Sequence, residues 1–222
     1  MPRTEQRKRR RGLLATLRGR KGLVASELAL VAPIFFLIVL AATDVVRVFR
    51  AQIRMEMIAV QIGQIVSQCP RIAPEDFPVL WGHAARIAGG LIDVNSPTGG
   101  AIVITALSRA NDANRVNWRQ RAGNTTFQST FGADNNTNAI ISGIIDPNTG
   151  NPTPFVIPAG QTLFGTEVLG FVTSGAISAG LIGAFLPNDL RSITMFLSRA
   201  SDPARLQAPP ATPVSPNTAC TA

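Results

Sequence analysis

An uncharged stretch near the N-terminus constrains this chain more than any other feature. From Leu28 to Thr43 the sixteen residues LALVAPIFFLIVLAAT carry no charge. Together with the short apolar run ahead of Glu27, they approach the roughly 20 residues that a helix needs to cross a bilayer. A strongly basic segment precedes them. By the positive-inside rule we expect the N-terminus to stay in the cytoplasm and everything after Asp44 to be exported.

The charge of the chain is concentrated ahead of this apolar run. The 222 residues have a formal net charge of +8, and residues 1–22 hold nine Lys or Arg against one acid, Glu5. The rest of the chain is balanced, with twelve bases and twelve acids. A nucleic-acid-binding domain spreads its bases over a folded face with aromatic residues between them, whereas this block contains no aromatic residue. We therefore expect no nucleic-acid partner.

A helical pattern continues past the apolar run without a break. Polar residues recur along one helix face, and an apolar stripe lies beside them. The polar face comprises Arg47, Arg50, Arg54, Gln61, Gln64 and Gln68, and the stripe comprises Val45, Phe49, Ile53, Met57, Ile62 and Ile65. Pro70 follows as a stop signal. We expect one helix over residues 23–68, roughly 69 Å long, in which Pro33 removes a hydrogen bond and can introduce a kink.

Three kinds of segment combine a basic region with an apolar run: a cleaved secretory signal, an uncleaved anchor and a prepilin-type leader. Val39 and Ala41 are small enough for conventional cleavage after Ala41. The amphipathic continuation suits a subunit that packs against neighbours, and it equally suits an anchor whose outer half covers its own domain. The general pattern leaves these alternatives open.

The junction between the basic and apolar segments resembles the processing site of type IV prepilins. Gly22 is followed by Leu23, Val24, Ala25 and Ser26 and then by Glu27, which gives a glycine before the cut and a glutamate as the fifth mature residue. The string GLVASELALVAP resembles the start of TadE-like minor pseudopilins of the tight-adherence (Tad/Flp, type IVc) pilus. Weaker resemblance continues in VITAL (103–107), VNWRQ (116–120) and GQTLFGTEV (160–168).

The resemblance implies a minor pseudopilin needed for pilus assembly and cell adhesion, not an enzyme, with no cofactor. The partners that it implies are a prepilin peptidase that cuts between Gly22 and Leu23, other minor pseudopilins, the major Flp pilin and the inner-membrane assembly platform. The implied location is the bacterial inner membrane or the pilus itself. The N-terminus would be cytoplasmic, the helix would cross the membrane once, and the C-terminal domain would be periplasmic.

The same resemblance gives Glu27 a partner. An ionised carboxylate inside lipid costs about 2.5 to 3.5 kcal/mol even on the lower insertion scales. Cleavage after Gly22 leaves a cationic amine on Leu23, one helical turn from the acid. An amine of the same or a neighbouring subunit then offsets the desolvation of Glu27. The alternative is a Glu27 that only extends to the cytoplasmic interface.

The chain after the helix is expected to form a small α+β periplasmic domain, antiparallel and rich in strands, over residues 71–206. A short helix is expected in APEDFPVLWGHAARIAGG, ended by Gly89 and carrying His83 as a half-buried surface residue. Strands are expected over 101–107, 116–120, 161–173 and 192–198, the first two as a hairpin. Turns and exposed loops are expected over 122–138 and 146–154, and a buried loop or a helix against the sheet over 174–187.

The residues that carry chemistry in other proteins are few. The two cysteines, Cys69 and Cys220, lack the spacing of zinc or redox sites, and His83 cannot hold a metal alone. In an oxidising compartment the cysteines can pair and tie the helix end to the Pro-rich tail, residues 207–222, which we expect to be disordered. Otherwise Cys220 stays free in that tail.

The remaining acid of interest is Glu167, in the predicted strand 161–173. As a lone carboxylate without an acid or base partner nearby in sequence, it is expected to be structural or to contact another subunit. The competing function is a membrane-anchored or secreted periplasmic enzyme or binding protein unrelated to pili. No nucleophile-elbow or metal motif in the sequence supports it.

Overall fold

The computed structural model describes residues 20–133, 139, 141–145, 150–172, 177, 185–211 and 220. They fall into two compact units, one within Met1–Arg47 and Ser174–Leu186, the other within Val48–Thr173 and Pro187–Ala222. Most of the basic leader, and most of the predicted loop or helix over 174–187, lie outside the described residues.

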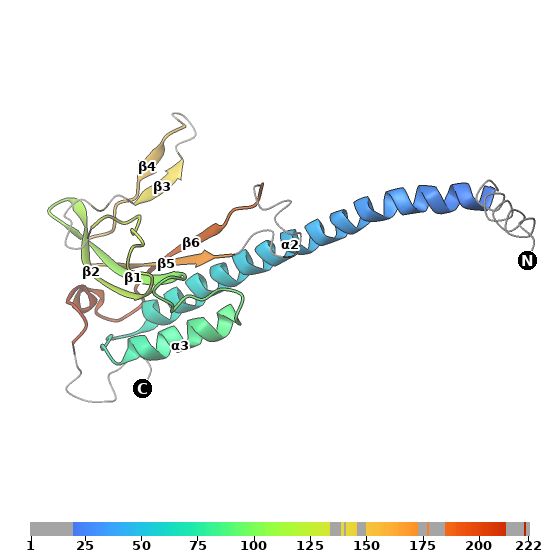
Figure 1. Ribbon diagram of the computed structural model, residues 1–222. Coiled ribbons are helices and arrows are strands. Elements are labelled where there is room, and N and C mark those ends of the chain that lie inside the picture. Colours follow the sequence, from blue (N-terminus) through green and yellow to red (C-terminus); the bar gives the residue numbers. More distant parts are fainter. Residues whose placement is uncertain are drawn as a thin grey trace, which may run out of the picture. The chain divides into compact units, whose positions relative to one another are not determined.

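Helix α2 spans Arg20–Gln68 and contributes residues to both units (Figure 1). Its end agrees with the prediction, and its start lies three residues earlier than the predicted residue 23. Gly22 does not prevent this earlier start, because a glycine inside a helix costs only about 1 kcal/mol relative to alanine. Pro33 lies inside the helix and does not end it.

In the first unit, the apolar part of α2 has its large side chains exposed. Leu28, Leu30 and Phe36 are 67%, 73% and 63% exposed. This helix is long and apolar enough to cross a membrane. A helix that is apolar on all sides needs lipid or other helices around it. At the end of the apolar stretch the carboxylate of Asp44 is buried and accepts a hydrogen bond from the backbone N–H of Ile177, at 3.2 Å.

The second unit is built on a four-stranded antiparallel sheet in the order β2-β1-β5-β6. The strands are β1 (Ala101–Ala110), β2 (Ala113–Gly123), β5 (Thr162–Phe171) and β6 (Asp189–Leu197). The predicted fold class, a long N-terminal helix before a small antiparallel α+β domain, is therefore confirmed. Asn111 and Asp112 join β1 to β2 with φ of 50° and 62°. Positive φ at both central residues is what a type I′ hairpin turn requires.

A second, two-stranded sheet pairs β3 (Ser142–Ile145) with β4 (Pro152–Pro154). The prediction of turns and loops throughout 146–154 is thus wrong for the last three residues. Proline is tolerated in a strand that lies at a sheet edge, because its missing N–H is then not needed by a neighbouring strand.

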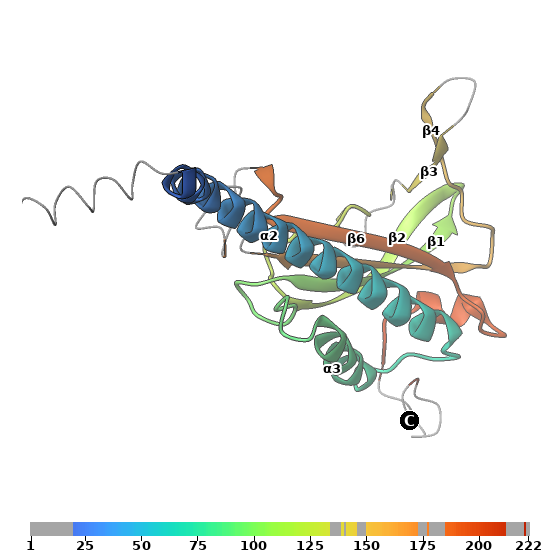
Figure 2. The same cartoon turned by 90° about the vertical axis from the view of Figure 1, so that its right-hand side faces the viewer.

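Two helices cover one face of the four-stranded sheet, and β3 and β4 lie on the other side of it (Figures 1 and 2). The helices are the part of α2 from Val48 onward and α3 (Asp76–Ala88). Phe77 of α3 packs edge-on against Trp118 of β2, with ring centroids 6.2 Å apart. On the opposite face a hydrophobic cluster joins the sheet to the chain around β3 and β4. Its members are Leu107, Val116, Phe131, Ala139, Ile141, Ile157 and Leu163.

The face of α2 that packs on the sheet differs from the apolar stripe identified in the sequence. The buried residues are Val48, Ala51, Met55, Ile58, Ala59, Ile62 and Val66. Of the predicted stripe only Ile62 is among them, whereas Phe49, Ile53, Met57 and Ile65 are exposed. Small residues explain the choice of face, because they let the helix approach the strands closely. The Thr194 hydroxyl donates to the Ala59 carbonyl at 2.9 Å, and a Cβ on Gly63 would lie 2.7 Å from Cδ2 of Phe196.

Helix α3 lies beside the C-terminal part of α2. The Arg54 guanidinium donates to the carbonyls of Ile87 and Ala88, at 3.1 and 3.0 Å, and so satisfies acceptors at the C-terminal end of α3. Gly89 caps the helix with φ of 57°, as predicted. His83 is exposed, not half-buried, because it falls outside the buried stripe of α3.

After β6 the chain forms the short 3-10 helix η2 (Pro203–Gln207). Two side chains of the sheet bind its backbone. The Thr162 hydroxyl donates to the Pro203 carbonyl at 2.6 Å, and Trp118 Nε1 donates to the Leu206 carbonyl at 2.9 Å. The folded domain therefore includes Gln207. Of the tail that was predicted to be disordered from this residue on, residues 212–219, 221 and 222 lie outside the described ones.

Candidate functional site: the helix junction, the Glu167 cluster and the disulfide

The expected processing site lies within helix α2. The backbone of Gly22 and Leu23 is helical, and Glu27 follows one turn later with an exposed side chain. Residues four apart on a helix lie on the same side of it. A carboxylate at this position is therefore available to a cation on its own helix or on a neighbouring one.

Farther along α2, the exposed apolar residues form a continuous surface. Phe49, Ile53 and Met57 are 66%, 49% and 50% exposed and recur every four residues, which places them along one side of the helix. Since the opposite side packs on the sheet, this surface does not serve the core of its own domain. It is a candidate surface for packing against another helix.

Glu167 is fully buried in β5 and is the centre of a polar cluster. One carboxylate oxygen, Oε1, accepts from the backbone N–H of Thr130 at 2.9 Å and from its hydroxyl at 2.7 Å. The other oxygen accepts from the hydroxyl of Ser129. These bonds hold the segment that follows β2 against the sheet. Glu167 thus has the structural role that the sequence suggested.

Arg191 of β6 completes this cluster and was not identified from the sequence. Its Nη2 donates to Glu167 Oε1 at 2.8 Å and to the Gln128 carbonyl at 3.2 Å. The guanidinium also lies 4.7 Å from the centroid of the Phe127 ring, in cation–π geometry. Arg191 is opposite Leu169 in the strand register, so it is the diagonal neighbour of Glu167. Only the register reveals this pair, and a separation of 24 positions in the sequence gives no local signal.

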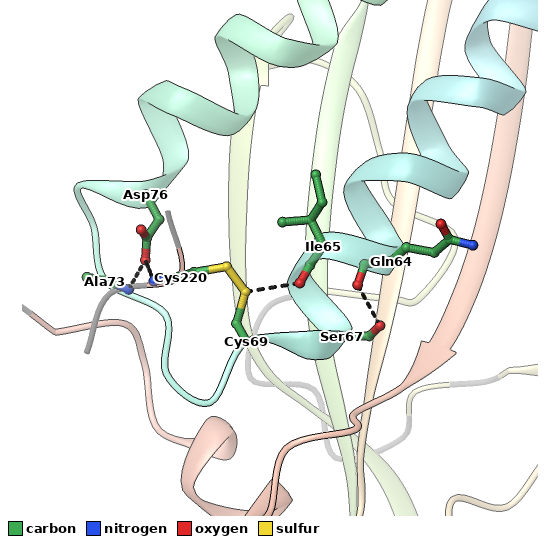
Figure 3. The surroundings of a disulfide bond; sticks show 7 residues. All are labelled: Gln64, Ile65, Ser67, Cys69, Ala73, Asp76 and Cys220. Carbon is green, nitrogen blue, oxygen red and sulfur yellow. Dashed lines mark hydrogen bonds between the residues drawn. A yellow bond between two sulfur atoms is a disulfide. The ribbon is translucent and has the colours of Figure 1, made fainter. Parts of the chain in front are cut away.

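The structure joins Cys69 and Cys220 in a disulfide, with Cα atoms 5.0 Å apart across a sequence separation of 151 (Figure 3). Cys69 directly follows α2, so the bond ties the end of the helix to the end of the chain. Asp76 supports both sides of this connection. Its Oδ2 accepts from the backbone N–H of Ala73 at 2.8 Å and from that of Cys220 at 3.1 Å.

Groups that would hold a metal ion are not found in the described part of the chain, where no three His, Cys, Asp or Glu side chains gather. Glu167 has its oxygens occupied by hydrogen bonds, and His83 stands exposed on α3.

Comparison with known proteins agrees with the resemblance seen at the junction. The family model described as TadE-like protein matches residues 22–63, which begin at the glycine of the expected cut and include Glu27 and the exposed Phe49, Ile53 and Met57. Comparison with curated proteins and with solved structures gives no match. Over residues 22–63, which form most of helix α2, this chain is therefore similar to the TadE-like family.

Proposed function

We propose that this protein is a minor pseudopilin that takes part in the assembly of a tight-adherence (Flp, type IVc) pilus. The observation that carries the proposal is the TadE-like match over residues 22–63, since it covers the junction and the helix together. The family assignment indicates a component of the Tad pilus system, and surface adhesion would be the purpose of the assembled fibre. The protein would then act through assembly contacts rather than through catalysis.

The proposed maturation step is cleavage of the peptide bond between Gly22 and Leu23 by a prepilin peptidase. The new α-amine would be a cation four residues before Glu27. In the low dielectric at the membrane edge, opposite charges attract more strongly than in water, so the pair offsets the desolvation of the carboxylate. An amine and a carboxylate on adjacent subunits would also fix their relative height in the membrane.

The exposed apolar side of α2 supports a role in packing. A helix advances 1.5 Å per residue, so Ile53 and Met57 lie roughly 15 and 21 Å beyond Thr43, the last residue of the uncharged run. Each headgroup region is only about 5 to 8 Å thick. Lipid alone would therefore leave these two side chains in water. For this surface we propose other minor pseudopilins and the major Flp pilin as partners. The contacts would form at the inner-membrane assembly platform.

The proposed location is the inner membrane, with a cytoplasmic leader, one span and the sheet domain in the periplasm. The excess of bases before the span supports this orientation. A disulfide between Cys69 and Cys220 also suits an oxidising compartment.

The mature N-terminus tests the proposal directly. The protein is purified from both the membrane and the soluble fractions of its own host, and its N-terminal peptide is identified by mass spectrometry. We expect a mature chain that starts at Leu23. A chain that starts at Ala42 would show ordinary secretion, and an intact Met1 would show a plain anchor. Either of these two results would refute processing as a pilin. A strain that lacks its prepilin peptidase is the control and should accumulate the full-length chain.

A further inference from the structure

A hollow of about 140 Å³ lies between η2, the segment that follows Cys69 and the sheet. Its apolar walls include Ile72, Trp118 and Leu206, and residues 208–211 close one side. These three wall side chains are almost fully buried, at 5%, 6% and 4% exposure. An apolar cavity of about 150 Å³ can bind benzene. This hollow therefore has room for one compact apolar group.

Two arginines, Arg71 and Arg205, also line the hollow. Within the described part of the chain, neither of them forms an ion pair or a hydrogen bond. Several other arginines of the domain do have partners. Arg54 and Arg191 donate to carbonyl or carboxylate oxygens as described above, and Arg119 donates to the Gly132 carbonyl at 2.7 Å. The hollow thus combines apolar walls with two cations that lack an anion.

The backbone that carries each arginine is fixed on both sides. Arg71 lies between the disulfide-bonded Cys69 and Ala73, whose N–H donates to Asp76. Arg205 lies in η2, between the hydrogen-bonded carbonyls of Pro203 and Leu206. A site whose parts are already in place loses less conformational entropy when a ligand binds.

We propose that this hollow binds a carboxylate that is attached to a compact apolar group. The guanidinium groups of Arg71 and Arg205 hold the carboxylate, since the guanidinium fork matches the two oxygens of a carboxylate. Ile72, Trp118 and Leu206 receive the apolar group. Two sources offer this chemistry: the C-terminus of a protein chain that ends in an apolar residue, and a small free carboxylic acid. The site plays no part in the proposed processing or helix packing, so it stands or falls independently of them.

The test follows the fluorescence of Trp118 in the full-length protein in detergent micelles. The chain has two tryptophans, and Trp81→Phe leaves Trp118 as the only indole. The probes are N-acetyl-leucine, which carries a carboxylate, and N-acetyl-leucinamide, which does not. We expect saturable binding of the acid, at least ten-fold tighter than binding of the amide. The factor is large because hydrogen bonds between charged groups contribute more than neutral ones.

Arginine variants in the same background identify the residues that bind. Arg71→Gln and Arg205→Gln should each weaken the binding of the acid about ten-fold and leave that of the amide unchanged. Arg115→Gln is the matched control, since Arg115 is exposed and is not among the residues that line the hollow. Arg205→Lys, which keeps the charge, should bind the acid more tightly than Arg205→Gln. Circular dichroism verifies that each variant is folded.

Several results would overturn the proposal. They are the absence of saturable binding, equal binding of acid and amide, or an Arg115→Gln effect as large as that of the other two variants. A peptide that ends in leucine then distinguishes the sources of the carboxylate. Binding of its free-acid form ten-fold more tightly than N-acetyl-leucine supports a protein C-terminus. Equal binding of the two acids supports a small free acid.

Discussion

The ion pair between Glu167 and Arg191 gives the sharpest prediction on stability. The perturbation is Arg191→Met, which removes the charge but keeps an apolar stem over the Phe127 ring. Glu167 is fully buried, whereas the side chain of Arg191 is 35% exposed. Loss of one partner of a buried pair costs about 3 to 5 kcal/mol. Because solvent already screens part of this pair, we expect Arg191→Met to lower the free energy of unfolding by about 2 to 3 kcal/mol.

Substitution of the other partner, Glu167→Gln, should lower the free energy of unfolding by less. In Glu167→Gln the side-chain carbonyl can still accept from Thr130, and the released guanidinium of Arg191 can turn toward water. We expect a loss of about 1 kcal/mol, the usual net contribution of a hydrogen bond. The double variant no longer buries an unpaired charge, so its loss should be smaller than the sum of the single losses. Coupling between residues in contact is about 0.5 to 3 kcal/mol.

The free energy of unfolding is measured for the wild type, the two single variants and the double variant. Each full-length chain is unfolded with urea in micelles, and its tryptophan fluorescence is followed. Stabilities are compared only where the dependence on urea is the same, so that the denatured states are comparable. Arg115→Met is the control and should change stability by less than about 0.5 kcal/mol, as surface substitutions usually do. An additive double variant, or an Arg191→Met loss no larger than that of the control, would refute the reasoning.

Three further predictions concern helix α2 and the disulfide. Glu27→Ala should leave membrane insertion intact but abolish piliation, measured by electron microscopy, while normal piliation would contradict the charge pairing. Gly63→Ala should lower the free energy of unfolding by about 1 to 3 kcal/mol, because the added methyl group overpacks against Phe196. Gly82→Ala on helix α3 is the comparison. Open space surrounds that position, so this substitution should raise the free energy of unfolding by about 0.5 to 1 kcal/mol. Thermal unfolding compares the two, and equal effects would contradict the close packing. Cys220→Ser should lower stability by up to about 5 kcal/mol, the chain-entropy value for so long a loop, and an unchanged urea midpoint would contradict this.

The helix and the main sheet could be predicted from the sequence because their signals are local. The helical spacing of polar residues and Pro70 defined the end of α2, and alternating or buried runs defined the strands. The signal for the processing site was equally local, since Gly22 and Glu27 are only five residues apart in the sequence. Patterns that extend over a few residues can be recognised without knowledge of the tertiary structure.

The features that could not be predicted depend on tertiary contacts. Both sides of α2 beyond Thr43 carry apolar residues, so hydrophobicity alone could not identify the buried side. The small side chains of Ala59 and Gly63 determine which side is buried, because only on this side can β6 approach the helix closely. The partner of Glu167 depended on the register between two strands far apart in sequence. The strand at residues 152–154 was hidden by its prolines, which normally argue against a strand.

The disulfide has a consequence for proteolysis. Cys69 and Cys220 enclose the whole sheet domain in one covalent ring that is joined to the helix at a single point. A protease that cuts once within this ring opens it but releases no fragment. The cut protein would stay on its anchor and would migrate as two pieces only after reduction. If the helix is the membrane anchor proposed above, this ring protects the sheet domain from release by any single cut in its loops.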